Sequence, residues 1–445
     1  MGEKDTYNNS MKSYIVGGYV RDLILAESDQ TCQGAVPQTA HDRDFVVVGA
    51  TVDDMLAAGY HQVGAAFPVF LHPETREEYA LARRELKTGD RHTDFSFDFS
   101  PDTTVDEDAA RRDFSINALY LCPDTQVVLD PTGTGLTDLA KGVLRHAGAG
   151  FAEDPLRIMR AARFAAQLGF SVAPETELLI RDMVARDMLA HLSRERIDNE
   201  FTRAMTAGYD SSAFLNYLLD WGALQQLYPE LAAMATVEEN HIYHRSATTW
   251  GHVMAALDIA HKQSPRVKTA VVYHDVYKPV SYRQQDARGK HLPHDDEKAL
   301  QYVRDYFAQR MFDRRTKTLC KLSIRYHMRI RLLFDGMSVK KWVDMMAALT
   351  NGFRADYQQQ LIDFLEVCKA DDLSDKTAAC FAGKGGRQRW EVFSAVALQT
   401  FEVCHAIQAR DIDGYAEMGV PQLVDALRRK RITATATAVD FFKNR

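Results

Sequence analysis

The first third of the chain alternates short apolar runs with turns marked by glycine and proline. These runs are rich in β-branched and aromatic residues and predict strands within SYIVGG, RDFVVVG, PVFLHP, EYALAR and TQVVLDP. After Gly17-Gly18, the apolar positions of VRDLILAE recur at helical spacing and predict an amphipathic helix. The polar stretches 28–41 and 88–104 fall between these elements, and we expect loops there.

The pattern changes near Phe151. From EDPLRIMRAARFAAQLGF onward, apolar residues recur at helical spacing almost to the end of the chain, with few strand signals. The pattern therefore predicts an α+β protein. An α/β head with a mixed or antiparallel sheet spans 1–145, a helical region spans 146–240, and a second helical region spans 241–445.

Composition favours a soluble protein of several compact units. The 445 residues are 46% hydrophobic and 26% charged, and no apolar run reaches the roughly 18 to 20 residues that span a bilayer. The acidic, polar start differs from a signal peptide, and the six cysteines lack CxxC spacing, so we expect a cytoplasmic protein with free thiols and no membrane partner. The net charge of −7 argues against nonspecific coating of nucleic acid, but it leaves a nucleic-acid substrate open.

Paired carboxylates form the most specific constellation. Asp42 and Asp44 stand one residue apart at the start of a predicted strand, so their side chains project from one face. Such a pair suits two Mg²⁺ ions, which prefer carboxylates and substrate phosphates as ligands. Upstream, the Gly17-Gly18 turn allows backbone N–H groups to approach a phosphate, and Arg21 on the following helix is a candidate to reach it.

Two further groups extend this candidate site. Glu78, in EYALAR, is the candidate third carboxylate, although it could also be an exposed strand residue beside Glu77. Arg112 and Asp113, in RRDFSINALY, suit phosphate oxygens and a ribose hydroxyl, respectively. The alternative is an ordinary charged turn.

A predicted helix start carries residues that could read a base. Asp154 precedes Pro155, which is typical of a helix N-cap, but a cap does not require Arg157 or Arg160. Asp154 and Arg157 lie three apart on one helical face. Cytosine and adenine both present an amino donor beside a ring-nitrogen acceptor, whereas guanine and uracil present the reverse, so an accepting aspartate and a donating arginine would select CTP and ATP. Arg160 is a plausible second donor to base or phosphate.

Together, these motifs resemble the class II, bacterial-type CCA-adding tRNA nucleotidyltransferases. The similarity rests on IVGGYVRD, DRDFVVVG, VGAAFPVFLHPETREEYALAR, RRDFSINAL, LDPTGTGLTDL and EDPLRIMRAARFAA, and it weakens after about residue 170. The resemblance implies a nucleotidyltransferase head, a helical neck and body, and a tail. It implies metal ligands at Asp42 and Asp44 and nucleotide contacts from Gly18, Arg21, Arg112, Asp154, Arg157 and Arg160. It also implies CTP, ATP and the tRNA 3′ end as substrates, joined by two-metal phosphoryl transfer with Mg²⁺.

A second constellation lies in the C-terminal helical region. His274-Asp275 is flanked by further histidines and a distant aspartate, and the arrangement resembles the HD metal-dependent phosphohydrolases, whose ligands would here be His252, His274, Asp275, His294, His327 and Asp371, with His291 nearby. Such a site would hold Ni²⁺ or another divalent metal and act as a phosphodiesterase or phosphatase. Tyr277 stands where the usual HDLGK run has glycine, so a vestigial site is the alternative.

Several alternatives stay open from the sequence. Bacterial poly(A) polymerases share the same head but carry a basic VGRRF-like segment, where this chain has Val63–Pro68. A phosphohydrolase with a nucleotide-sensing head and a noncatalytic RNA-binding protein are the other possibilities. Basic residues collect at 309–331 and 428–431, either as RNA contacts or as solvated helix faces. The sequence leaves the oligomeric state open.

Overall fold

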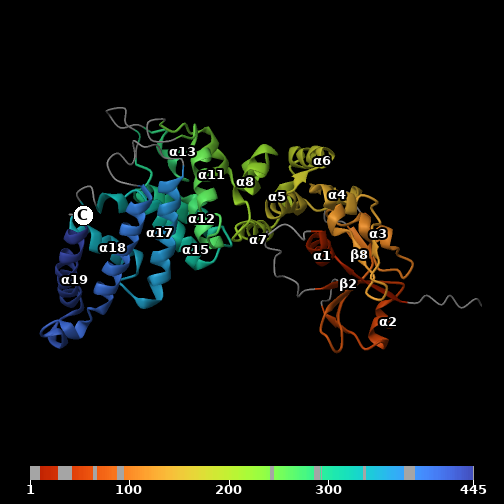
Figure 1. The fold of residues 1–445 in the computed structure, drawn as a ribbon, viewed down its shortest axis with the longest axis horizontal. Coiled ribbons are helices and arrows are strands. Elements are labelled where there is room, and N and C mark those ends of the chain that lie inside the picture. Colours follow the sequence, from red (N-terminus) through yellow and green to blue (C-terminus); the bar gives the residue numbers. More distant parts are fainter. Residues whose placement is uncertain are drawn as a thin grey trace, which may run out of the picture. The chain divides into compact units, whose positions relative to one another are not determined.

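The computed structural model describes residues 11–28, 43–63, 68–87, 95–240, 245–284, 291, 293–333, 337–374 and 386–443. The chain divides into two compact units, residues 1–191 and 192–445. Unit 1 contains the predicted sheet, and unit 2 is helical, so the α+β class is confirmed (Figure 1). The division into three regions at 145 and 240 stays a prediction.

A mixed seven-stranded sheet forms the centre of unit 1. Its strand order is β3-β4-β5-β2-β1-β8-β9, with β2 and β5 parallel and the other neighbouring strands antiparallel. The strands are β1 (Lys12–Val16), β2 (Asp44–Val48), β3 (His61–Val63), β4 (Val69–Leu71), β5 (Glu78–Leu81), β8 (Tyr120–Leu121) and β9 (Val128–Leu129). All five strands predicted from the apolar runs are therefore confirmed.

Six α-helices accompany this sheet among the described residues of unit 1. They are α1 (Gly18–Ser28), α2 (Val52–Ala57), α3 (Val105–Ala110), α4 (Gly135–Lys141), α5 (Leu156–Leu168) and α6 (Pro174–Ala185). A buried apolar cluster joins the sheet to α3. It consists of Val16, Val46 and Tyr120 from the strands, Ala109 from α3, and Ala118. Gly169 ends α5 in the left-handed conformation (φ 68°), which glycine adopts without steric cost.

The expected loops are only partly as predicted. Phe95–Asp98 forms β7 and pairs antiparallel with β6 (Arg84–Lys87), so the loop expected over 88–104 is wrong for these four residues. Alternation of phenylalanine with polar residues was the overlooked strand signal. A further short strand, Ser171–Val172 (β11), pairs in parallel with Val143–Leu144 (β10). Residues 29–42 and 64–67 lie outside the described residues.

Unit 2 is built around a buried helix, α12 (Pro265–Tyr273), whose residues from Val267 to Tyr273 are all buried. It packs against α11 (Thr249–Ile259), α15 (Arg314–Tyr326) and α17 (Gln358–Leu373). The remaining helices are α7 (Arg194–Ala204), α8 (Ser211–Asp220), α9 (Ala223–Leu227), α10 (Pro229–Ala232), α13 (Lys278–Ser281), α14 (Glu297–Ala308), α16 (Val339–Leu349), α18 (Gly386–Ala406) and α19 (Val420–Lys443). Among the described helices, none combines the length and apolar character needed to cross a membrane.

Candidate active site

Two carboxylates stand side by side at the beginning of neighbouring strands. Asp44 opens β2 and Glu78 opens β5, and the parallel pairing sets these two residues opposite each other. Because aligned residues of adjacent strands point to the same face of a sheet, both carboxylates leave the sheet together, and both residues are exposed. Asp42, the other predicted ligand, lies outside the described residues.

The preceding residues of the two strands pair with each other. Arg43 forms an ion pair with Glu77, one position before Asp44 and Glu78. Since successive residues of a strand alternate between faces, this ion pair lies on the opposite side from Asp44 and Glu78. The charge of Glu77 is thereby balanced by Arg43, and Glu78 is the acid aligned with Asp44.

The glycine turn lies beside these carboxylates. Val16, the last residue of β1, pairs with Asp44, so Gly17-Gly18 follows directly from the position beside this aspartate. Gly17 has a φ of 77°, a conformation that favours glycine, and the turn leads at once into α1. The backbone N–H groups that open α1 therefore lie next to the carboxylate edge.

Arg21 is buried behind this turn. Its guanidinium donates to Asp22 at 2.7 Å and to Asn117 at 2.9 Å, and it stacks on the ring of Phe164 at 5.2 Å. A Cβ added at Gly18 would lie 3.4 Å from the same guanidinium. Arg21 is thus held against the backbone of the turn.

The RRD segment is organised by a buried aspartate. Asp108 accepts hydrogen bonds from Arg111 at 2.5 Å, from Arg112 at 3.0 Å and from the Tyr120 hydroxyl at 2.6 Å. Burial alone would raise the pKa of Asp108, but the two arginines outweigh it and lower the pKa to about 2. The ionised carboxylate therefore orients both arginines.

Asp113 joins the same segment to helix α5. It accepts from Arg160 at 2.5 Å and from the side chain of Asn117 at 3.1 Å. Burial opposes ionisation of Asp113, but Arg160 and Asn117 together lower its pKa below the ordinary value. Since Asn117 also accepts from Arg21, a continuous hydrogen-bonded chain runs from Arg21 to Arg160.

The proposed base-reading pair lies at the start of α5. Asp154 accepts from the backbone N–H of Leu156 at 3.1 Å, which is the contact of a helix cap. Arg157 donates to the backbone carbonyls of Gly150 at 2.6 Å and Arg111 at 2.5 Å. Arg157 therefore ties α5 to the RRD segment in this structure, and the base-reading role of the pair stays a prediction.

In unit 2, the predicted HD residues converge in a buried cluster. The Nε2 of His252 lies 3.1 Å from Asp371, and the Nε2 of His274 lies 3.2 Å from Asp275. His294 and His327 lie 3.3 and 3.5 Å from Asp275. Three overlapping groups of these residues have ligand atoms within 4.8 Å of one another, a spacing that could hold a metal ion.

Backbone contacts orient two of these imidazoles. The Nδ1 atoms of His274 and His327 lie 2.7 Å from the carbonyls of Val271 and Ser323, respectively. An Nδ1–H bound to a carbonyl leaves Nε2 as the lone-pair atom that a metal requires. Burial lowers the pKa of His327, which favours the same neutral form. The buried Nε2 atoms of His274 and His294 make no hydrogen bond within the described part of unit 2, so the donor set fits a metal.

Asp275 forms a buried ion pair with a lysine that also pairs with a second acid. Lys278 donates to Asp275 at 2.8 Å and to Glu239 at 2.6 Å. Burial opposes the charge on Asp275, but His274 and Lys278 lower its pKa well below the usual range. Tyr277 has an ordinary right-handed backbone (φ −89°), which any residue adopts, and its ring faces Tyr302 at 5.4 Å between centroids.

Some residues of both clusters were not foreseen. His291 packs on Tyr282 outside the buried cluster. Conversely, Asp108, Asn117 and Glu239 were not predicted. Asp108 and Asn117 contact predicted site residues, whereas Glu239 contacts Lys278, which pairs with Asp275. The acidic residue four before Arg112 was a usable signal, because i and i+4 face each other on a helix. No local pattern connects Glu239 with Lys278.

The fold and the paired carboxylates define a nucleotidyltransferase head. The family model described as "Poly A polymerase head domain" matches residues 13–145, and one described as "Probable RNA and SrmB- binding site of polymerase A" matches residues 169–234. The chain is 35% identical to the "Multifunctional CCA protein" of Stenotrophomonas maltophilia over 96% of this chain and all of that protein. It is 37% identical to the protein of the same name from Hahella chejuensis, over 95% and 94% of the two chains. The chain belongs to this family, the multifunctional CCA proteins.

A solved structure has the same fold. The Bacillus stearothermophilus CCA-adding enzyme in complex with CTP superimposes with a TM-score of 0.56, covering 95% of this chain and 89% of that one at 20% identity. The matched region extends beyond the head into the helical unit, so the two chains share their fold almost throughout.

Proposed function

We propose that this chain adds C, C and A to the 3′ end of tRNA from CTP and ATP without a template. The observation that carries the proposal is the alignment of Asp44 with Glu78 beside the Gly17-Gly18 turn. Identity of 35–37% to multifunctional CCA proteins over nearly the whole chain favours this function over tailing with A alone. The reaction would take place on tRNA in the cytoplasm.

Different residues of the head would bind the metals, the triphosphate and the ribose during phosphoryl transfer. Asp42, Asp44 and Glu78 would hold Mg²⁺, which when bound stabilises the charge that develops on the phosphate oxygens. The N–H groups of Gly17 and Gly18 would receive the triphosphate, with Arg21 contributing positive charge behind the turn. Arg112 would contact phosphate and Asp113 the ribose hydroxyl, each oriented by the contacts with Asp108 and Arg160, respectively.

The choice of base would depend on residues at the start of α5. Asp154 accepts and Arg157 donates, the pattern complementary to the edges of C and A. In this account Arg160 acts beside them as a further donor. Incorporation from each of the four triphosphates into tRNA lacking CCA tests the function, and use of UTP or GTP at the rate of CTP would contradict it.

We infer a second activity for unit 2, hydrolysis of phosphate esters at the HD cluster. Its support is the convergence of four imidazoles and two carboxylates with buried Nε2 atoms. These residues would hold Ni²⁺ or another divalent ion, which when bound supplies an activated water. Release of phosphate or ring opening with 2′,3′-cyclic and 2′-phosphate substrates, with each metal added in turn, tests this activity.

A further inference from the structure

Helix α15 has a charge pattern that its helical fold does not explain. Between Arg314 and Tyr326 it contains five cations and no carboxylate, and the cations are Arg314, Arg315, Lys317, Lys321 and Arg325. Solvated helices usually mix charges of both signs, because i,i+4 pairs of opposite sign stabilise them. A single-sign helix is therefore unlike an ordinary solvent-facing helix.

The position of these cations within α15 is also unfavourable. Arg314, Arg315 and Lys317 occupy its first turn, where the helix dipole favours acidic residues, and the first turn contains none. The acid at this end is the N-cap, Asp313, which accepts from the backbone N–H groups of Arg315 and Thr316. A cation at this end of a helix is unfavourable, because the first backbone N–H groups carry partial positive charge. Among the described residues, Arg314, Arg315, Lys317 and Lys321 form no ion pair that would offset this cost.

Three of the cations share one side of α15, where Arg314 is exposed and Lys317 and Lys321 are half-buried. Arg314, Lys317 and Lys321 follow the i, i+3, i+7 spacing of one helix face, whereas Leu319 and Ser323 on the other side are buried. At 1.5 Å per residue, this face extends about 10 Å, a length that can follow successive phosphates of one strand. His327, immediately after the helix, points into the HD cluster, so the cationic face and this cluster use different sides.

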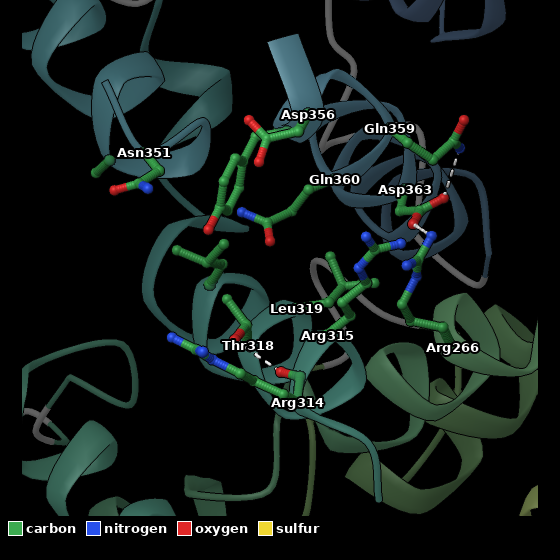
Figure 2. A pocket seen from close by; sticks show the side chains of 13 residues that line it. Arg266, Arg314, Arg315, Thr318, Leu319, Asn351, Asp356, Gln359, Gln360 and Asp363 are labelled. Atoms are coloured by element: carbon green, nitrogen blue, oxygen red, sulfur yellow. Dashed lines mark hydrogen bonds and ion pairs between the residues drawn. The ribbon is translucent and has the colours of Figure 1, made fainter. Parts of the chain in front are cut away.

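A cavity of about 430 Å³ adjoins the cationic face (Figure 2). Arg315 and Arg266 extend into it toward Asp363, and Thr318 and Gln360 supply further polar groups. Asp363 pairs with Arg266, so its charge is already balanced within the cavity wall.

The other acid of the cavity, Asp356, is paired as well, with Arg354 at 3.1 Å. The guanidinium groups of Arg314 and Arg315 therefore leave an excess of positive charge in and beside the cavity.

The two units of the chain have opposite net charge. Residues 1–191 contain 18 Lys and Arg against 30 Asp and Glu, a net charge of −12. Residues 192–445 contain 36 against 31, a net charge of +5. A polyanion would thus be attracted to unit 2 more than to the acidic unit 1.

We propose that the cationic face of α15, formed by Arg314, Lys317 and Lys321, binds the phosphate backbone of the tRNA substrate. The adjoining cavity takes one phosphate with its ribose, in contact with Arg315 and the polar groups around it. The site rests on the proposed tRNA substrate and adds a contact that lies outside the nucleotidyltransferase motifs. Neutralisation of phosphate offsets the unfavourable position of the first-turn cations.

The test is the salt dependence of tRNA binding, measured by fluorescence anisotropy on the full chain with tRNA lacking CCA. The triple variant Arg314→Gln, Lys317→Gln, Lys321→Gln should lower the slope of log affinity against log salt by roughly two to three, about one per phosphate contact. The variant should also raise the KM for tRNA and leave the KM for CTP unchanged. Its melting temperature should be unchanged or higher, because cations are removed from the first turn.

A charge-matched control removes three exposed cations elsewhere in unit 2, in Arg203→Gln, Lys262→Gln, Arg304→Gln, and should leave the slope near that of the wild type. An equal loss in this control, or an unchanged slope in the α15 variant, would overturn the assignment. If the α15 variant loses binding of inorganic phosphate in calorimetric titration while its tRNA slope is unchanged, the ligand is a free anion rather than RNA. Failure of the wild type to bind tRNA at all would instead refute the proposed function.

Discussion

Asp44 and Glu78 are register partners at the first positions of two parallel strands. The arrangement sets an acid of β2 and an acid of β5 on one face, next to the turn that opens α1. The Arg43–Glu77 ion pair on the opposite face balances the neighbouring acid. One edge of the sheet thus concentrates negative charge where a metal-bound triphosphate would lie.

The carboxylate edge leads to the first prediction. Asp44→Ala should abolish nucleotide addition and leave tRNA binding largely intact, because in the proposed site the carboxylate would hold the metals and would not contact tRNA. Glu78→Gln should lower addition by at least tenfold, whereas Glu77→Gln, its neighbour on the other face, should change it little. Incorporation of labelled CTP at saturating Mg²⁺ measures all three. Near-wild-type addition by the Asp44 variant would exclude this carboxylate as a metal ligand.

The second prediction concerns base choice at the start of α5. If Asp154 and Arg157 read the base edge, Asp154→Asn and Arg157→Ala should relax discrimination against UTP and GTP. Hydrogen bonds to charged groups contribute on the order of 1.5–3 kcal/mol each, so CTP and ATP use should fall by at least tenfold.

The observed contacts of these residues define the competing outcome. Asp154 caps α5, and asparagine is an equally good cap, so a purely structural aspartate predicts an unchanged CTP-to-UTP ratio in Asp154→Asn. Arg157 bonds to the carbonyls of Gly150 and Arg111, so Arg157→Ala requires a check of the fold by circular dichroism. An unchanged ratio in both folded variants would leave only the structural roles.

The third prediction separates the two activities. His274→Ala and Asp275→Ala should remove hydrolysis of 2′,3′-cyclic and 2′-phosphate substrates without affecting CCA addition, because the two clusters belong to different units. Assays with Ni²⁺, Co²⁺, Mn²⁺ and Mg²⁺ added separately would find the active metal. His291→Ala is the matched control, since His291 lies outside the buried cluster. No hydrolysis by the wild type with any of these metals would identify the cluster as vestigial.

The fourth prediction links Asp108 to acid stability. Its pKa is lowered from 3.8 to about 2 in the folded chain, so its stabilising effect is complete above about pH 3.8 and is lost as the pH falls toward 2. The difference corresponds to about 2 kcal/mol. Asp108→Asn should therefore destabilise unit 1 by at least this amount at pH 7 and by less at about pH 3. Scanning calorimetry of both proteins measures the difference, and an equal loss at both pH values would show that the charge is not its cause.

Local patterns in the sequence sufficed for much of the fold. Apolar spacing and turn residues predicted the strands that contain Val46 and Tyr79 and the helix that follows Gly17. These signals come from residues close together in the chain. Phe95–Asp98 was missed because its strand lies in a polar stretch and depends on a partner, Arg84–Lys87.

The placement of the candidate residues was predictable where chemistry and spacing coincide, as at Asp44 and at His274-Asp275, while their roles stay predictions. The supporting contacts of these residues were not predictable, because they join residues far apart in sequence. Asn117 bridges Arg21 and Asp113, and Glu239 reaches Lys278 across 39 positions. Only the folded chain brings such residues together.

The central claim is most directly tested by supplying the chain with three tRNAs, ending before the first C, after one C, and after CC, each with labelled CTP or ATP alone. CTP should be added to the first two tRNAs, and ATP should be added once to the third. Extension of every tRNA by a run of A from ATP alone would contradict the central claim and identify a poly(A) polymerase instead.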